Sequence, residues 1–248
     1  MADIRRNPSR WAGFASRRVG RLVSTTPDGI TVGTATLLST EGTFGIISTA
    51  AHCLTTGEHD HVDSRVLLGR RHGIPTRRPS GRHLEVLRAF VPTAWRERAS
   101  VEHDLAFAVV RLPREFDAEV LGPEVRPDFS KDIDEGPVAV VGFESRVFPR
   151  RAVIRNIASV DRPFADATAY RARCGISSGG SGGPWLVRRG GSIHQFSVTS
   201  FGSRRDRRVL FGPTWDAEAA ELHAAASQAA AQATHLADRG PPDLPLGS

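Results

Sequence analysis

Short apolar segments follow one another along most of the chain between residues 20 and 215. Residues 30–38 read I-T-V-G-T-A-T-L-L, whereas residues 105–110 and 138–141 are unbroken apolar runs. Val, Ile, Phe and Thr are frequent in these segments and Gly, Pro, Asp or Ser bound them, a pattern typical of antiparallel strands. We therefore expect an all-β sandwich or barrel without a long helix in this region.

The strand pattern is interrupted once, at residues 113–137, which hold four prolines and an acidic cluster at 128–135. Such a stretch is typical of a linker or crossing segment. It would divide the strands into a first barrel at about 20–115 and a second barrel at about 137–215. Each barrel would contain about five or six strands.

After Trp215 the pattern changes from strand to helix. Residues 216–239 are rich in alanine, carry acidic residues in the first turn and precede Gly240, Pro241 and Pro242, which predicts a helix that ends there. Its apolar stripe is mostly alanine, so we expect it to pack against a barrel or a partner and not to form a coiled coil. Residues 240–248 are predicted to be a tail.

The first 19 residues are interpreted as an N-terminal extension. They are rich in arginine but lack the apolar core of a secretory signal, and Pro8 and Gly13 are expected to interrupt any helix there. No stretch approaches the eighteen or so consecutive apolar residues that a membrane span requires. We therefore expect neither export nor a membrane partner.

Composition adds that the chain is an ordinary globular protein, with 40% hydrophobic and 24% charged residues among 248. The formal net charge is +6, and Lys131 is the one lysine among the 33 basic residues. The arginine clusters are short, scattered and without interleaved aromatics, which favours a coding bias and solvated loops over a nucleic-acid surface. Nucleic acid is therefore not an expected partner.

The sharpest local motif is S-S-G-G-S-G-G-P at residues 177–184, with Ser181 among four glycines. Glycines permit positive backbone angles and close approach of a substrate to main-chain amides. A flexible Gly/Ser turn explains the motif equally well, so this segment does not decide its own role.

Two other segments supply groups that could activate a serine. His52 lies in T-A-A-H-C after an apolar strand, and Asp104 lies in H-D-L-A at the start of another. A serine hydroxyl needs a base near neutral pH, and the base needs an acid that fixes its tautomer. His52, Asp104 and Ser181 together provide all three groups.

The motifs T-A-A-H-C, H-D-L-A and G-G-S-G-G-P, in this order, resemble the trypsin-like (chymotrypsin-fold) serine protease family. The resemblance implies an all-β fold of two antiparallel six-stranded β-barrels, here followed by a C-terminal α-helix, with residues 20–215 as the peptidase domain. It implies that His52 is the general base, Asp104 orients it and Ser181 is the nucleophile. The amides of Gly179 and Ser181 would form the oxyanion hole, the substrate would be a protein or peptide, and no cofactor is expected.

The segment V-T-S-F-G at residues 198–202 resembles the family's V-S-W-G strand, which pairs with the substrate backbone. In the family the serine of this strand supports the triad aspartate, and the glycine is a wall of the primary specificity pocket. The expected substrate-binding residues are Gly175, Ile176, Ser178, Ser200, Phe201 and Gly202.

Two departures from the family change the expected activity. Gly180 stands where activatable members have an aspartate that pairs with a new N-terminus, which predicts activity without N-terminal cleavage. Gly175 stands where members selective for basic side chains carry an acid. We therefore expect a neutral pocket for an apolar or small residue at P1, the residue whose carbonyl is attacked, unless an acid such as Asp206 enters from another loop.

The two cysteines also depart from the family. Cys53 matches one half of a family disulfide, but Gly33 occupies the partner position, and Cys174 has no evident partner. Two free thiols suit a reducing compartment, so a cytoplasmic location is expected. A regulatory protein partner is considered as a source of restraint, because the zymogen pair is missing.

Three other interpretations remain. The segment also satisfies G-x-S-x-G, the nucleophile elbow of esterase-type α/β-hydrolases, whose histidine would follow the serine, as His194, His223 or His235 do. A protease-like peptide-binding module without catalysis is a second interpretation. The third is a metal site at residues 58–61, E-H-D-H, which is weak because no other ligand pattern accompanies it.

Overall fold

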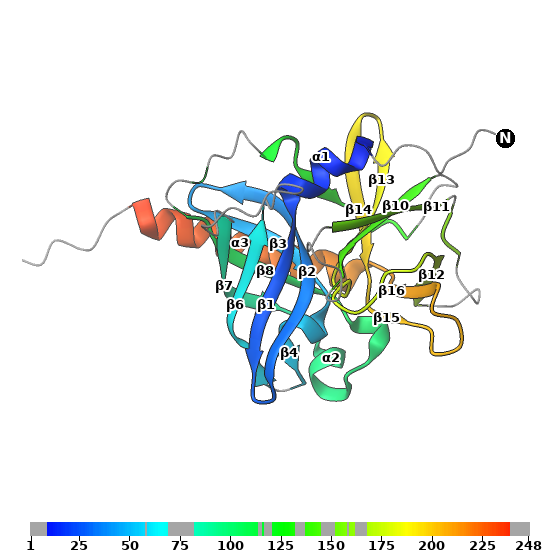
Figure 1. Ribbon diagram of the computed structural model, residues 1–248. Helices are drawn as coiled ribbons and strands as arrows, with labels where there is room; N and C mark the ends of the chain where they lie inside the picture. Colours follow the sequence, from blue (N-terminus) through cyan, green and yellow to red (C-terminus); the bar gives the residue numbers. More distant parts are fainter. Residues whose placement is uncertain are drawn as a thin grey trace, which may run out of the picture.

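The structure is a computed structural model that describes residues 9–57, 59–68, 82–113, 116, 121–131, 137–144, 152–157, 159–161 and 168–238. Parts of the predicted crossing segment and second barrel lie outside the described residues. Figure 1 shows two β-rich halves side by side, with helix α1 across one end of both and helix α3 running along the first half.

Six antiparallel strands of the first half close into a barrel in the order β1-β2-β3-β8-β7-β6. They are β1 (Val19–Thr26), β2 (Gly29–Glu41), β3 (Phe44–Thr49), β6 (Val62–Leu68), β7 (Arg82–Phe90) and β8 (Ala106–Arg111). Strand β3 is buried at every position and β8 at all but its last, because the barrel core lies on one side and α3 packs on the other. The predicted first barrel of six strands is confirmed.

Within the described residues, the second half forms two sheets, and these do not close into the predicted six-stranded barrel. Among the described residues, five strands pair in the order β11-β10-β13-β14-β9 and three in the order β12-β16-β15. They are β9 (Val125–Pro127), β10 (Val138–Phe143), β11 (Ala152–Ile157), β12 (Ala169–Arg173), β13 (Pro184–Arg189), β14 (Ser192–Val198), β15 (Phe201–Gly202) and β16 (Val209–Pro213). Strand β9, from the predicted crossing segment, pairs in parallel with β14.

The two sheets meet without a ladder between β14 and β16. The Ser197 hydroxyl donates to the Pro213 carbonyl oxygen at 2.8 Å, and the Ser200 N–H donates to the Phe211 carbonyl oxygen at 2.9 Å. A side chain on Gly212 would lie only 2.4 Å from the Val198 carbonyl oxygen, so the backbones touch closely here. The strands therefore pack tightly while their hydrogen-bond ladders remain separate.

Short elements connect the strands at the end of the barrel where His52 lies. They are the 3-10 turns η2 (Ala51–Cys53) and η3 (Val101–His103), the strands β4 (Thr55–Thr56) and β5 (His59–Asp60), and helix α2 (Thr93–Arg98). Strands β4 and β5 pair with each other as a separate two-stranded ribbon. These segments surround the site described below.

The N-terminal segment contains a helix that the sequence did not predict. Helix α1 (Ser9–Arg18) runs through Gly13, which was expected to interrupt it. Trp11, Phe14 and Ala15 are buried on its inner face, and the helix contacts strands of both halves. Burial of each large side chain contributes about 1.5–3 kcal/mol, which exceeds the cost of about 1 kcal/mol for an internal glycine.

Arg18 anchors the end of α1 in the protein. Its side chain is almost fully buried, and its guanidinium donates to the carbonyl oxygens of Leu37, Leu38 and Gly122 at 3.2, 3.0 and 2.9 Å. Burial lowers the pKa of Arg18 from its usual value. Five donors in a fixed fork suit guanidinium to such a cluster of carbonyls, so Arg18 ties the barrel to the segment that leaves it.

The alanine-rich segment forms helix α3 (Ala217–Asp238), which packs on β3, β7 and β8. Ala219, Ala226 and Ala230 are buried against the barrel, and the Thr234 hydroxyl donates to the Glu41 carbonyl oxygen at 3.0 Å. The alanine stripe therefore covers the barrel of its own chain. None of the described helices combines the length and the apolar character of a membrane span.

Candidate active site

The barrel brings His52 and Asp104 together at one end. His52 follows β3 and Asp104 precedes β8, and these strands pair with Thr49 opposite Ala106. The His52 Nδ1–H donates to Asp104 Oδ2 at 2.7 Å, and the His52 backbone N–H donates to Asp104 Oδ1 at 2.9 Å. Two hydrogen bonds between the same residues fix both the ring and the main chain of His52.

Burial and hydrogen bonding shift both groups of this pair. Burial alone would raise the pKa of Asp104, but hydrogen bonds and charge from His52 and a hydrogen bond from the Ser200 hydroxyl hold it below its usual value. Burial alone would lower the pKa of His52, but the neighbouring Cys53 and the Asp104 carboxylate raise it well above 6.5. The pair therefore favours an ionised aspartate beside a basic imidazole.

The Ser181 loop of the second half lies against the first barrel. The Thr34 backbone N–H donates to the Ser181 carbonyl oxygen at 2.7 Å, and the Cys53 thiol contacts the same oxygen at 3.7 Å. Gly182 has a φ of +79°, and a side chain there would come within 2.1 Å of the Thr49 hydroxyl. The glycine is therefore required for the loop to approach the barrel this closely.

The structure places the Ser181 carbonyl oxygen 3.7 Å from the thiol of Cys53, the residue that follows His52. Among the described residues, no hydrogen bond joins Ser181 Oγ to His52 Nε2. In ligand-free sites such bonds are often long and tighten only when the substrate binds. Strand β13 follows the serine where a nucleophile elbow requires a helix, so the α/β-hydrolase interpretation is wrong.

Two backbone amides near Ser181 are free to bind an anion. Neither the Gly179 N–H nor the Ser181 N–H donates a hydrogen bond within the described part of the chain. The peptide between Gly179 and Gly180 is held at both ends: the Thr34 hydroxyl donates to the Gly179 oxygen at 2.8 Å, and the Gly180 N–H donates to the Ser177 oxygen at 3.1 Å. Both unused donors therefore flank a peptide of fixed orientation.

Thr34 and Glu144 are site residues that the sequence analysis missed. The buried Thr34 hydroxyl accepts a hydrogen bond from the Phe143 N–H at 2.9 Å while it donates to Gly179. The Glu144 carboxylate accepts the Ser177 N–H at 2.9 Å. Neither residue belongs to a local motif, because each acts on a segment that is distant in the sequence.

A cavity of about 580 Å³ opens beside Ser181. The structure brings the six predicted substrate-binding residues together in its lining, which consists of Glu144, Gly175, Ile176, Ser177, Ser178, Ser181, Thr199, Ser200, Phe201, Gly202, Ser203, Arg204, Arg207 and Leu210. Asp206 is the acid that the sequence analysis considered for this pocket, but it is not in the lining. It pairs instead with Arg208 and Arg173. The two arginines of the lining were not predicted.

The polar loop considered for a metal has other hydrogen bonds. His61 Nδ1 contacts the Cys53 carbonyl oxygen at 3.1 Å, His61 Nε2 contacts the Thr56 hydroxyl at 2.8 Å, and Asp60 pairs with Arg96. Within the residues that the structure describes, no group of three or more His, Cys, Asp or Glu side chains is arranged to hold a metal ion. Residue 58 lies outside them.

Several proteins of known structure share this fold. The thermostable serine protease AL20 from an extremophilic microorganism superposes with a TM-score of 0.72 at 20% identity, over 87% of this chain and 99% of that chain. The protease Anisep from Arthrobacter nicotinovorans gives 0.71 at 19% identity, over 86% of this chain and 96% of its own. A Glu endopeptidase gives 0.64 at 16% identity, over 92% and 95%.

These likenesses show that the chain shares the fold of bacterial serine proteases. No curated protein sequence matches it. The family model for the trypsin-like peptidase domain matches residues 33–193, which include all three motifs of the predicted triad. This match covers more than half of the sequence, and the chain therefore belongs to the trypsin-like peptidase family.

Proposed function

We propose that the protein is a serine endopeptidase that cleaves peptide bonds through an acyl-enzyme intermediate. The observation that carries the proposal is the pair of hydrogen bonds between His52 and Asp104, at 2.7 and 2.9 Å, next to the loop that bears Ser181. Because His52 Nδ1–H is bound to the carboxylate, the Nε2 lone pair is left to accept the proton of the Ser181 hydroxyl. Asp104 then stabilises the imidazolium that forms.

The reaction uses each group twice. Ser181 Oγ attacks the substrate carbonyl carbon while its proton moves to His52 Nε2, and the imidazolium then gives that proton to the leaving amine. Water repeats the sequence on the acyl-enzyme and releases Ser181. The free N–H groups of Gly179 and Ser181 would bind the oxyanion, and such a donor contributes about 3 kcal/mol to the transition state.

Activity is proposed to need no N-terminal cleavage. A side chain at Gly180 would lie 2.5 Å from Ile176 Cγ2, so the position has no room for the aspartate that other members pair with a new N-terminus. The segment Arg18-Val19-Gly20 only faintly resembles the family's cleavage site before I-V-G-G, and Arg18 is buried and bound to three carbonyl oxygens. Both observations support a loop that is ordered without a new N-terminal amine.

The P1 preference for an apolar or small residue remains part of the proposal. It is supported by the uncharged Gly175 and Ile176 in the cavity lining, where the carboxylate of the acid Glu144 already accepts the Ser177 N–H. A cytoplasmic location is likewise proposed, supported by Cys53 and Cys174, which are both free and buried. Burial raises the pKa of Cys174 to about 12, as expected of an inert thiol.

The proposal is tested by covalent labelling with a fluorophosphonate probe. Wild-type protein should be labelled, Ser181→Ala should not, and the matched variant Ser192→Ala at the start of β14 should be labelled as wild type. Unbiased peptide profiling of the same three proteins measures cleavage and P1 preference together. A folded wild-type protein that is neither labelled nor active would favour the non-catalytic peptide-binding module, and cleavage mainly after Arg or Lys would contradict the neutral pocket.

A further inference from the structure

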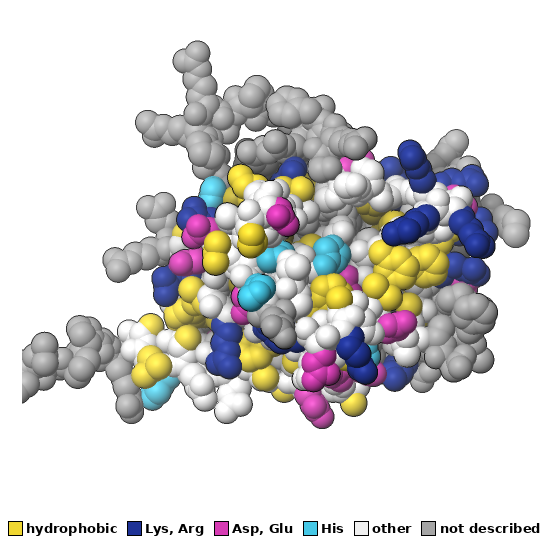
Figure 2. Space-filling view, turned by 90° about the horizontal axis from the view of Figure 1, so that it is seen from below, with side chains coloured by type: hydrophobic (Ala, Val, Ile, Leu, Met, Phe, Trp, Pro, Cys, Tyr) yellow, Lys and Arg dark blue, Asp and Glu magenta, His cyan; other side chains and the backbone are white. Residues whose placement is uncertain are grey.

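The turn that joins β15 to β16 carries an excess of positive charge, and we call residues 203–208 the arginine hairpin. It contains four arginines and one aspartate, which gives a formal charge of +3. The Ser203 hydroxyl accepts the backbone N–H groups of Arg205 and Asp206, both at 3.2 Å, so the turn has a defined shape. In the view of Figure 2, basic side chains gather toward one edge of the molecule, next to hydrophobic side chains.

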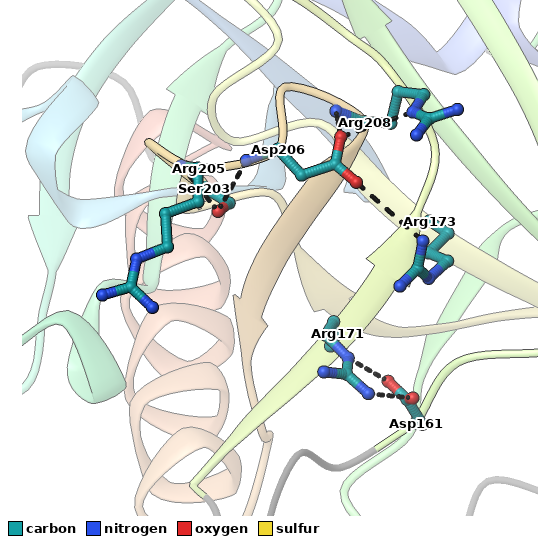
Figure 3. Close-up of polar contacts among 7 residues, drawn as sticks. All are labelled: Asp161, Arg171, Arg173, Ser203, Arg205, Asp206 and Arg208. Carbon is teal, nitrogen blue, oxygen red and sulfur yellow. Dashed lines mark hydrogen bonds and ion pairs between the residues drawn. The ribbon is translucent and has the colours of Figure 1, made fainter.

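Two described acids near the hairpin, Asp206 and Asp161, already have arginine partners. Asp206 accepts the Arg208 backbone N–H at 2.9 Å and pairs with Arg208 Nε at 3.3 Å and Arg173 at 3.9 Å. Asp161 accepts two hydrogen bonds from Arg171, at 2.9 and 2.6 Å. Figure 3 shows Asp206 between Arg208 and Arg173, and Arg205 directed away from it.

Arg204 and Arg207 line the cavity beside Ser181 and have no such partner. Both are exposed, and neither forms an ion pair with any residue that the structure describes. Glu144 is the one acid in the cavity lining, and one of its carboxylate oxygens already accepts the Ser177 N–H. Two unpaired arginines at a cleft raise the local concentration of anionic groups and speed their association.

The position of the hairpin relates it to a particular part of the substrate. Strand β15 is the edge strand in the order β12-β16-β15, and it directly follows Ser200, which contacts Asp104. A substrate peptide can pair with this edge in antiparallel direction while its cleaved bond lies at Ser181. The residue three positions before that bond then lies next to Gly202. The residues before that one pass the arginine hairpin.

We propose that Arg204 and Arg207 bind aspartate or glutamate side chains at substrate positions P3 to P5, counted from the cleaved bond toward the N-terminus. The proposal rests on the peptidase function above and adds a second determinant to the P1 preference proposed there. A guanidinium matches a carboxylate with two parallel hydrogen bonds. The preferred substrates are therefore acidic protein segments followed by an uncharged P1 residue.

Two peptides with the same P1 and primed residues test this, one with Glu and the other with Gln at P3 to P5. The wild-type protein should cleave the Glu peptide with a kcat/KM about three- to tenfold higher at low salt, as expected for exposed charge pairs. High salt should reduce the ratio toward one, because the interaction is screened. Equal cleavage of both peptides at low salt would overturn the proposal.

Matched variants identify the residues responsible. The double variant Arg204→Gln/Arg207→Gln should lose the preference for Glu, so that the ratio of its kcat/KM values for the Glu and Gln peptides falls toward one. The control Arg65→Gln/Arg111→Gln removes the same charge from exposed positions on the barrel and should keep the preference. If the control loses it equally, the effect comes from net charge and the assignment to the hairpin is wrong.

Binding to the inactive Ser181→Ala variant separates this proposal from the peptidase function. Fluorescence anisotropy should show tighter binding of the Glu peptide than of the Gln peptide, and the difference should vanish when Arg204 and Arg207 are replaced. No cleavage by wild type together with this binding difference would contradict only the peptidase function. Binding of a single-stranded DNA oligonucleotide through the two arginines, without discrimination between the peptides, would assign the hairpin to nucleic acid and overturn the proposal.

Discussion

The two halves of the protein hold their site residues in different ways. In the first half, His52 and Asp104 flank paired strands of a closed barrel, and two hydrogen bonds join them directly. In the second half, Ser181 lies in a glycine-rich turn before β13, and the sheets around it remain separate. The turn is nevertheless fixed, because Thr34 of the barrel binds the carbonyl oxygens of Gly179 and Ser181.

This difference indicates that the first barrel positions the candidate site residues of both halves. The Ser48 hydroxyl also donates to Gln195 Oε1 at 3.0 Å, and both residues are fully buried between the halves. Buried polar groups that find their partners across an interface fix the relative position of the two sides. The second half therefore needs no closed barrel of its own to place Ser181.

The largest expected effect is on the pair within the barrel. Asp104→Asn should lower kcat by about 10⁴-fold, because an amide cannot hold His52 in the tautomer that leaves Nε2 unprotonated. Peptide-cleavage assays measure the activity, and thermal unfolding of the same samples measures the stability. Asp60→Asn, at an exposed position, is the control. An Asp104→Asn variant with activity within tenfold of wild type would break the assignment of the pair to the reaction.

A disulfide inside the barrel should have the next largest effect, on stability. A side chain at Gly33 would have its Cβ 2.6 Å from Cys53 Sγ, so Gly33→Cys should form a bond that closes a loop of some 20 residues. Loop closure predicts about 3 kcal/mol of added stability in oxidising buffer. Thermal unfolding with and without reductant measures it, and Gly33→Cys/Cys53→Ala should show no difference between the two buffers.

The contact between the halves should have a smaller effect on rate. Thr34→Val removes the hydroxyl that orients the Gly179 peptide, and kcat should fall about 10- to 100-fold with little change in KM. Thr34→Ser retains the hydroxyl and should restore most of kcat. If Thr34→Val keeps the wild-type kcat, the barrel does not position the serine turn, and the comparison of the halves fails.

The smallest effect is a shift in pH dependence. The pKa of His52 is raised above 6.5, and the base must be neutral, so kcat/KM should reach half its maximum above pH 6.5. The stabilisation from protonated His52 is fully present below pH 6.5 and is lost as the pH rises through the raised pKa. Activity and melting temperature should therefore change in opposite directions, and an acid limb at or below pH 6.5 would contradict this.

Sequence motifs predicted the candidate site because each of its residues lies in a short local segment. His52, Asp104 and Ser181 each lie in a short recognisable segment at a strand end, and strand patterning predicted the first barrel. Thr34 could not be found in this way, because its hydroxyl acts on Gly179, 145 residues away. Helix α1 was missed because tertiary burial of Trp11 and Phe14 outweighs the low helix propensity of Gly13.

The open second half was missed for a similar reason. Strand propensity predicts that β14 and β16 are strands, but not which strands they pair with or that the Ser197 hydroxyl binds the Pro213 carbonyl oxygen between them. The arginine hairpin was interpreted as a solvated loop, because the sequence gives the charge of this segment but not its position relative to the cavity. Its relation to the cavity became visible only with β15 at the sheet edge.

Helix α3 has a practical consequence for handling the protein. Its last turns lie beside Glu41, seven residues along β2 from Thr34, which is about 23 Å at 3.3 Å per residue. A support or reporter attached beyond this helix is therefore held at the opposite end of the barrel from Ser181. Immobilised enzyme coupled through that end should leave the cleft open to large folded substrates.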